Sequence, residues 1–442
     1  MSGRTSTRTF ERSIELTRRL EAVVPGGAHT YAKAADQYPE HMAPIIAHGS
    51  GAHVWDVDGN EYIEYGSGLR SVALGHAHPR VLAAVTSVLA DGSNFVRPSA
   101  IELAAAETMV ALAGDVDMVK FAKNGSDATT AAVKLARAAT GRDLVAICRD
   151  HPFFSTDDWF IGAGAMPAGV PVRTRDQTLS FGYDDLDETA ALFEAHRGEI
   201  AAIILEPMTA TVPTPGYFDG LRRLCDDHGV LLILDEMITG FRLATGAFHP
   251  QLGARPDLVC FGKAMGNGFS VSALAGRREY MRLGGFDHNE ERVFLLSTTH
   301  GAETHALAAA LAVIDTHEIE NVPAELQRIG RGLAERATMA IEAAGVADHL
   351  KVMGNPANLI HATLDGDGRR SQPFRTLFMA ELLKRGVIAP SFVVSTALSD
   401  DDINATADAV YEAGLVYRRA LDHGIDTELV GRPVQPAIRP RG

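Results

Sequence analysis

The stretch Asp257-Leu-Val-Cys-Phe-Gly-Lys-Ala-Met-Gly-Asn-Gly268 decides the fold, because a short apolar run leads directly into Lys263. The apolar part, Leu258 to Phe261, has the length and composition of a buried strand. A buried strand does not end in a lysine without a reason, since an unpaired buried charge is costly. Three glycines flank this lysine and leave room for a bulky group against the backbone. The stretch therefore predicts a functional lysine at the end of a buried strand.

A second apolar run, Val230 to Leu234, leads directly into Asp235 and Glu236. A carboxylate at one strand end and a lysine at a later strand end suit pyridoxal phosphate. The lysine forms a Schiff base with the aldehyde of this cofactor, and the aspartate keeps the pyridine nitrogen protonated, so that the ring withdraws electrons. Either residue alone is more often a surface lysine or a helix-capping aspartate. Together, and with a phosphate-binding turn, they predict pyridoxal phosphate as the cofactor.

That turn lies within Phe121-Ala-Lys-Asn-Gly-Ser-Asp-Ala128, which follows one predicted strand and opens a helix. Gly125 and Ser126 would place backbone N–H groups and a hydroxyl at the helix N-terminus, where an anion is favoured. On its own this segment would more often be an ordinary Ser/Asp helix cap. The lysine and aspartate on later strands favour the phosphate-binding interpretation.

The composition is that of a globular protein with more than one domain: 442 residues, of which 46% are hydrophobic and 22% charged. The net charge of −15 argues against nucleic acid and anionic membrane as partners. The three cysteines form no CxxC pair, which disfavours a metal or disulfide framework. The first residues contain no apolar signal core and no stretch is long enough to span a membrane, so we expect a cytoplasmic location.

The apolar segments between about residues 80 and 320 predict an α/β fold. Helices alternate there with short buried strands, which indicates a mostly parallel sheet covered on both faces, with ligands at the carboxyl ends of the strands. The predicted helices are Ala100–Leu112, Ala128–Ala139, Phe218–His228 and Ala306–Thr316, and the predicted strands are Met118–Ala122, Leu144–Cys148, Ala201–Leu205, Leu231–Leu234, Leu258–Phe261 and Val293–Leu296.

The two ends of the chain follow other patterns. Residues 10–23 predict an amphipathic helix, and residues 53–65 predict a hairpin around the turn Asp58-Gly59. From 321 onward we expect a smaller α+β domain with helices at 323–344, 373–385 and 400–420. Its predicted strands are Lys351–Met353, Ala357–Leu364 and Val387–Ile388. The expected organisation is an N-terminal segment packing with the small domain (1–60), a large cofactor-binding domain (61–320), the small domain (321–425) and a tail (426–442).

Taken together, the motifs of this chain resemble those of a known family, the class III (fold type I) pyridoxal-phosphate aminotransferases. They are most similar to the glutamate-1-semialdehyde 2,1-aminomutase branch of that family. The resemblance extends from Val24 to about Leu415. It implies a large domain with a mostly parallel seven-stranded sheet plus a smaller α+β domain, and a homodimer with active sites at the interface. It also implies an amino donor and a carbonyl acceptor as substrates. The motifs that carry it are Val-Pro-Gly-Gly (24–27), Val-Trp-Asp-Val-Asp-Gly (54–59), Leu-Gly-His-Ala-His-Pro (74–79), Asn-Gly-Ser-Asp-Ala (124–128), Leu-Glu-Pro (205–207), Asp-Glu-Met-Ile-Thr-Gly-Phe-Arg (235–242) and Gly-Lys-Ala-Met-Gly-Asn-Gly (262–268).

The resemblance also implies roles for individual residues. Lys263 matches the Schiff-base lysine, which also moves the proton between substrate and cofactor, and Asp235 matches the partner of the pyridine nitrogen. Asn124, Gly125 and Ser126 match the phosphate-binding turn. The remaining matches are Thr299, which reaches the phosphate of the neighbouring subunit, Phe153, which stacks on the pyridine ring, Met237, which supports its other face, and Glu206, which lies near the O3′ atom of the cofactor.

The substrate-facing positions depart from the aminomutase branch. Thr30 and Lys33 stand where that branch has a serine and an arginine for the substrate carboxylate, and a lysine lacks the bidentate geometry of arginine. Leu69 and Arg70 fall near the pocket, and Arg70 is either a relocated carboxylate-binding group or a surface arginine. The segment 389–396 lacks the branch's glutamate. We therefore expect an aminotransferase acting on a small polar aldehyde or ketone, such as a secondary-metabolite or amino-sugar precursor, with an aminomutase or an epimerase as alternatives and no metal site.

Overall fold

The computed structural model describes residues 8–438, and their contacts divide the chain into two compact units. The first unit comprises the described residues up to 69, residues 73–78, and those from 325 onward. The second unit comprises residues 70–72 and 79–324. Residues 61–69 and 73–78 thus belong to the unit that contains the chain's C-terminal part, whereas the expected large domain began at residue 61.

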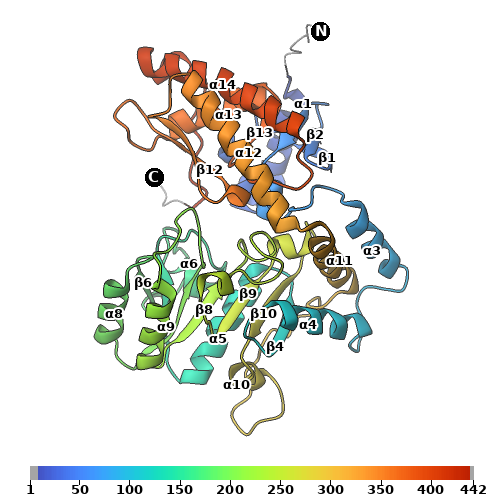
Figure 1. Ribbon diagram of the computed structural model, residues 1–442, viewed down its shortest axis with the longest axis vertical. Coiled ribbons are helices and arrows are strands. Elements are labelled where there is room, and N and C mark those ends of the chain that lie inside the picture. Colours follow the sequence, from blue (N-terminus) through green and yellow to red (C-terminus); the bar gives the residue numbers. More distant parts are fainter. Residues whose placement is uncertain (1–7, 439–442) are drawn as a thin grey trace. The chain divides into compact units, whose positions relative to one another are not determined.

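The second unit is built on a seven-stranded sheet with the order β4-β10-β9-β8-β7-β5-β6 (Figure 1). All strands are parallel except β10, which pairs antiparallel with β4 and β9. Every residue of β7, β8, β9 and β10 is buried, as expected for strands covered on both faces. The bounds are β4 Met118–Ala122, β5 Leu144–Cys148, β6 Thr178–Phe181, β7 Ile200–Leu205, β8 Leu231–Asp235, β9 Leu258–Phe261 and β10 Ser272–Gly276.

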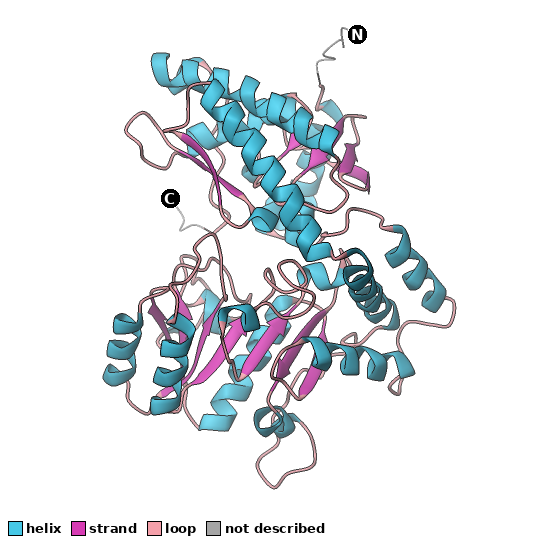
Figure 2. Ribbon diagram, in the orientation of Figure 1, coloured by secondary structure: helices cyan, strands magenta, loops and turns pink. Residues whose placement is uncertain are grey.

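The strand order explains which helices cover each face. The chain moves one way along the sheet from β4 to β5 and the opposite way from β6 to β9. Because crossovers between parallel strands are right-handed, α5 covers one face and α8 and α9 cover the other (Figure 2). The helices of this unit are α3 Pro79–Leu89, α4 Ala100–Leu112, α5 Gly125–Thr140, α6 Asp158–Ile161, α7 Val172–Arg175, α8 Leu186–Ala195, α9 Tyr217–His228, α10 Arg278–Met281 and α11 Thr304–Glu320.

One predicted strand, Val293–Leu296, is wrong. Val293 and Leu295 are buried, but no neighbouring strand pairs with them, and Leu296 adopts a left-handed conformation (φ 47°) that ends the extended run. The prediction rested on apolar character alone. Ser272–Gly276 completes the sheet instead, and it escaped prediction because its residues are small and carry little strand propensity.

The first unit combines segments from both ends of the chain. β13 pairs in parallel with β3, and the buried side chains of Val54, Tyr62, Leu383 and Ile388 form a core beneath this junction. The four-stranded sheet contains β1 Ile46–Ser50, β2 His53–Asp56, β3 Glu61–Glu64 and β13 Val387–Ile388, and the two-stranded sheet contains β11 Leu350–Met353 and β12 Ile360–Thr363. The helices are α1 Glu11–Val23, α13 Gln372–Lys384, α14 Asp400–His423 and, from residue 325 onward, α12 Val322–Ala343.

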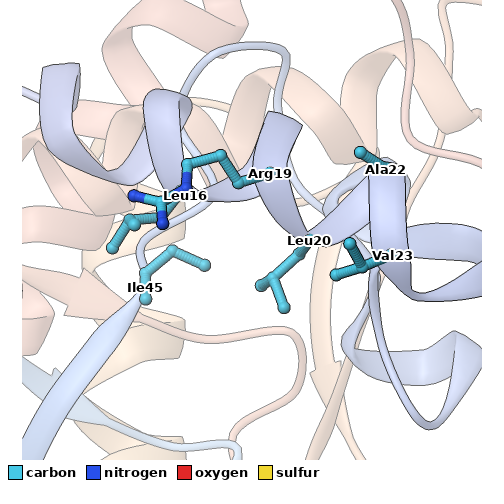
Figure 3. A pocket seen from close by; sticks show the side chains of 6 residues that line it. All are labelled: Leu16, Arg19, Leu20, Ala22, Val23 and Ile45. Atoms are coloured by element: carbon cyan, nitrogen blue, oxygen red, sulfur yellow. The ribbon is translucent and has the colours of Figure 1, made fainter.

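Part of the stretch expected as a tail packs on this unit. The side chain of Val434 is buried, and its backbone N–H donates to Thr376 Oγ1 at 2.8 Å. A hollow along α1 is lined mainly by apolar side chains and contains no group suited to amino-group chemistry (Figure 3). Among the described residues, no helix combines the length and hydropathy needed to cross a membrane.

Candidate active site

The carboxyl edge of the seven-stranded sheet brings Asp235, Glu206 and Lys263 together. Asp235 is the last residue of β8 and pairs with Cys260 of β9. Leu205 pairs with Leu234, so Glu206 lies directly beside Asp235. Lys263 follows the end of β9 at the first position of a short 3₁₀ turn, Lys263–Gly266, in a left-handed conformation (φ 46°). This backbone conformation costs energy for a residue with a side chain, as occurs at functional sites.

The two carboxyl groups are nearly inaccessible, with exposed fractions of 4% each. One oxygen of Asp235 accepts the Met237 N–H at 2.9 Å, whereas the Glu206 carboxyl accepts no hydrogen bond from the described residues. Burial raises the pKa of Asp235 to about 6, although Lys263 opposes the shift. Burial and the neighbouring charge of Asp235 raise the pKa of Glu206 to about 8. The Glu206 carboxyl therefore keeps its proton at neutral pH, whereas a cationic partner would stabilise the ionised form of Asp235.

The pKa of Lys263 is set by its burial and by the charged groups around it. Burial lowers the pKa of its amino group, Asp235 and Glu206 raise it, and the nearby Arg70 and Arg242 lower it further. A lysine with a lowered pKa is more often neutral and nucleophilic than a solvated one.

The turn at the start of α5 has the groups that a phosphate requires. Asn124 caps the helix by accepting the Asp127 N–H at 3.1 Å. The backbone N–H groups of Gly125 and Ser126 have no partner among the described residues. Ser126 Oγ accepts the N–H of Thr156 at 3.0 Å, so its own hydrogen can be donated outward. Two free N–H groups and a hydroxyl at a helix N-terminus fit a phosphate group.

Met237 connects this turn to the lysine. A Cβ atom added to Gly125 would lie 3.1 Å from Met237 Sδ, and one added to Gly262 would lie 2.6 Å from the same atom. The methionine side chain is buried between the two glycines. It therefore fills the space between the phosphate turn and the strand end that carries the lysine.

Phe153 lies on the loop after β5 and is 42% exposed. Its ring packs edge-on against Phe160, with the ring centroids 5.5 Å apart. The adjacent Phe154 is buried, and its carbonyl accepts Thr129 Oγ1 of α5 at 2.7 Å. This bond ties the Phe153 loop to the helix that begins at the phosphate turn.

Thr299 lies on an exposed loop before α11. Its carbonyl accepts the side-chain amide of Asn94 at 3.1 Å, and the Thr304 N–H donates to the Ser93 carbonyl at 3.0 Å. The loop is thus held beside the segment that precedes α4.

The predicted substrate residues fall in different units. Arg70 belongs to the second unit, and its carbonyl accepts Arg242 Nη2 at 3.2 Å. Thr30, Lys33 and Leu69 belong to the first unit, and their roles stay predictions. Within residues 8–438 no cluster of three or more His, Cys, Asp or Glu side chains forms a metal site.

Sequence reasoning assigned no role to two buried residues at this edge. Arg242 is fully buried, and burial together with Arg70 lowers its pKa to about 9. His151 Nδ1 accepts the Glu206 N–H at 2.9 Å, which places the ring proton on Nε2 because the backbone group must be the donor. Arg242 ends the motif 235–242, and His151 follows the predicted strand Leu144–Cys148. Only the hydrogen bonds of the folded chain reveal that Arg242 contacts Arg70 and that His151 contacts Glu206.

Comparison with known proteins identifies the family. The model of the family Aminotransferase class-III matches residues 34–151 and 163–398. The chain belongs to this family. Glutamate-1-semialdehyde 2,1-aminomutase of Acetivibrio thermocellus is 33% identical over 427 residues, covering 91% of this chain and 97% of that protein. The same-named protein of Chloroflexus aurantiacus (strain J-10-fl) is 38% identical over 289 residues, and that alignment covers 63% of this chain and 65% of the relative.

Solved structures agree with this assignment. The internal aldimine form of the FumI protein of Sphingopyxis sp. MTA144, which contains pyridoxal phosphate, superposes with a TM-score of 0.84 at 27% identity, covering 93% of this chain and 98% of that chain. An omega-transaminase of Sphaerobacter thermophilus gives 0.82 at 27% identity, covering 92% and 97%. The predicted family, fold class and cofactor and the class of enzyme, a class III aminotransferase, are thereby confirmed.

Proposed function

We propose that this aminotransferase moves an amino group from an amino donor to a small polar aldehyde or ketone. The observation that carries the proposal is the juxtaposition of Lys263, Asp235 and Glu206 at the sheet edge, beside a turn that can bind phosphate. When bound, pyridoxal phosphate supplies a carbonyl group that takes up the amino group and a ring that withdraws electrons. The structural likeness to an omega-transaminase supports this transfer between two substrates.

Each residue has a defined task in this proposal. Asp235 holds the proton on the pyridine nitrogen with the carboxyl oxygen that Met237 leaves free. Lys263 carries the cofactor and moves a proton to and from the substrate carbon, which its lowered pKa favours. Asn124, Gly125 and Ser126 bind the phosphate. Phe153 and Met237 would hold the two faces of the ring, and the Glu206 carboxyl, which keeps its proton at neutral pH, would offer a hydrogen-bond donor near O3′.

We also propose a homodimer in which Thr299 reaches the partner's cofactor phosphate. Exposed apolar side chains near the Thr299 loop support this arrangement, because such groups favour a protein partner. Phe95 is 51% exposed, Val96 is fully exposed and Phe294 is 70% exposed. A cytoplasmic location and the absence of nucleic-acid or membrane partners stay predictions from composition.

For a substrate carboxylate we favour Arg70 over Lys33 as the binding group. The charge of Arg70 influences both Glu206 and Lys263, so its guanidinium lies near the reacting edge of the sheet. A guanidinium also binds a carboxylate through two parallel hydrogen bonds, which an ammonium group does not provide. Thr30 and Leu69 complete the proposed substrate set.

An aminomutase of the glutamate-1-semialdehyde type is the second candidate. Relatives with that name are about a third identical over most of the chain. A half-reaction screen separates the two functions. The purified protein is first offered single amino donors and then single carbonyl acceptors, and we expect a donor to convert the cofactor to its amino form until an acceptor is added. Isomerisation of one substrate without any second substrate would instead identify an aminomutase, and interconversion of stereoisomers without amino transfer would identify an epimerase.

A further inference from the structure

Lys123 stands directly before the phosphate turn and forms an ion pair across 180 residues of sequence. Its ammonium lies 2.6 Å from Glu303 Oε2, and the two side chains are only 22% and 15% exposed. Both residues lie in the second unit. Ion pairs with so little solvent contact are screened less than surface pairs, so this one constrains the segments that it joins.

Glu303 belongs to the Thr299 loop and is the residue immediately before α11. His300 Nδ1 lies 2.9 Å from its other carboxyl oxygen. The loop also packs closely on β4, because a Cβ atom added to Gly301 would lie 3.3 Å from the Phe121 carbonyl. The loop is therefore seated against the end of the strand that leads into the phosphate turn.

The turn itself is fixed by other contacts. The Lys123 carbonyl accepts Ser270 Oγ at 2.7 Å, and the Asn124 carbonyl accepts Ser272 Oγ at 2.7 Å. Asp127 Oδ2 accepts the N–H groups of Lys123 and Asn124 at 3.2 Å. None of these bonds involves the Thr299 loop, so the Lys123 side chain is the ionic link between the loop and the turn among the described residues.

We infer that Lys123 and Glu303 are positioning residues for the cofactor phosphate, holding the 124–126 turn and the Thr299 loop at a fixed separation. The inference rests on the proposed function, in which the turn binds the subunit's own phosphate and the loop reaches the partner's. Loss of either charge leaves the other poorly solvated beside the turn, and the loop then shifts relative to the turn, which its own contacts hold in place. The consequence falls on the phosphate group and not on the pyridine ring, which Asp235 and Lys263 hold.

The test compares two cofactor forms that differ only in the phosphate. Full-length protein freed of cofactor is titrated with pyridoxal phosphate and with pyridoxal, for the wild type and for Lys123→Met and Glu303→Gln. We expect each variant to bind pyridoxal phosphate about tenfold more weakly, with pyridoxal affinity unchanged. The conservative Lys123→Arg should recover most of the loss. The control is Arg282→Met, which breaks the exposed Arg282–Glu290 pair of the same unit and should change neither affinity.

Three outcomes overturn the inference. Equal losses for both cofactor forms would mean that the pair only stabilises the fold, and circular dichroism with thermal melting would show that effect directly. Unchanged binding of pyridoxal phosphate in both variants would mean that the pair has no positioning role, while the wild type's preference for the phosphorylated form would leave the proposed function intact. A wild type that binds the two forms equally would refute the phosphate turn itself.

Discussion

Replacing Asp235 with asparagine or alanine should slow amino transfer by about two to four orders of magnitude without unfolding the protein. The Asp235 carboxylate is 4% exposed and has one oxygen engaged by Met237, so it can give the pyridine nitrogen one strong, desolvated hydrogen bond. Removing one partner of such a buried charged pair costs about 3–5 kcal/mol. Since about 1.4 kcal/mol corresponds to a tenfold change in rate, the loss is about 10²–10⁴-fold if the pair is strongest in the transition state.

The assay is the single-turnover rate of the donor half-reaction at saturating cofactor, followed by the absorbance of the bound cofactor. Asp257→Asn is a matched control, because Asp257 is equally buried but lies at the amino end of β9, where it pairs with Arg222 at 2.9 Å. The control should lower the unfolding free energy and leave the rate of the folded fraction within a few-fold of the wild type. A near-normal rate for Asp235→Ala would refute the reasoning.

Three further predictions address the surrounding groups. Glu206→Gln should stabilise the cofactor-free protein by roughly a few kcal/mol at pH 8 but little at pH 4.5. The raised pKa of Glu206 means that the folded protein keeps a proton that the unfolded chain loses. The wild type therefore loses stability as the pH rises from 4.5 to about 8, and the glutamine variant does not. Urea unfolding at both pH values measures this, and a pH-independent difference would contradict the shift. Arg70→Gln should lower kcat/KM for a carboxylate-bearing donor by about 10²-fold with cofactor still bound, and Lys33→Gln by much less; no effect of either would favour a substrate without a carboxylate. Thr299→Val should weaken pyridoxal phosphate binding several-fold while sedimentation still shows a dimer, and a fully active monomer would rule out the shared site.

The sequence was most informative where apolar runs met polar residues. Met118–Ala122, Leu144–Cys148 and Leu258–Phe261 are strands with the predicted bounds, because branched and aromatic residues in short runs have few alternatives in a covered sheet. The hairpin around Asp58-Gly59 also forms as predicted. Ser272–Gly276 escaped prediction because its small residues carry little strand propensity, and Thr178–Phe181 is a four-residue strand that is defined by its pairing with Val145–Cys148.

The residues of the candidate site also divide into those that the sequence predicts and those that only the folded structure reveals. Lys263, Asp235 and the 124–126 turn could be proposed from the sequence because each stands where an apolar strand ends, with residues suited to the cofactor. The positions of Arg242 and His151 and the Lys123–Glu303 pair could not be found, because they depend on strand register and on contacts across many residues. The raised pKa of Glu206 likewise arises from its place beside Asp235 in the sheet.

The central claim, that Lys263 carries pyridoxal phosphate, is tested most directly by borohydride reduction of the purified protein followed by peptide mass spectrometry. We predict a phosphopyridoxyl group on the peptide that contains Lys263, with no such label in Lys263→Ala, which should keep its fold, bind the cofactor without a covalent link and show no steady-state turnover. Label on another lysine, or wild-type turnover by Lys263→Ala, would contradict the assignment.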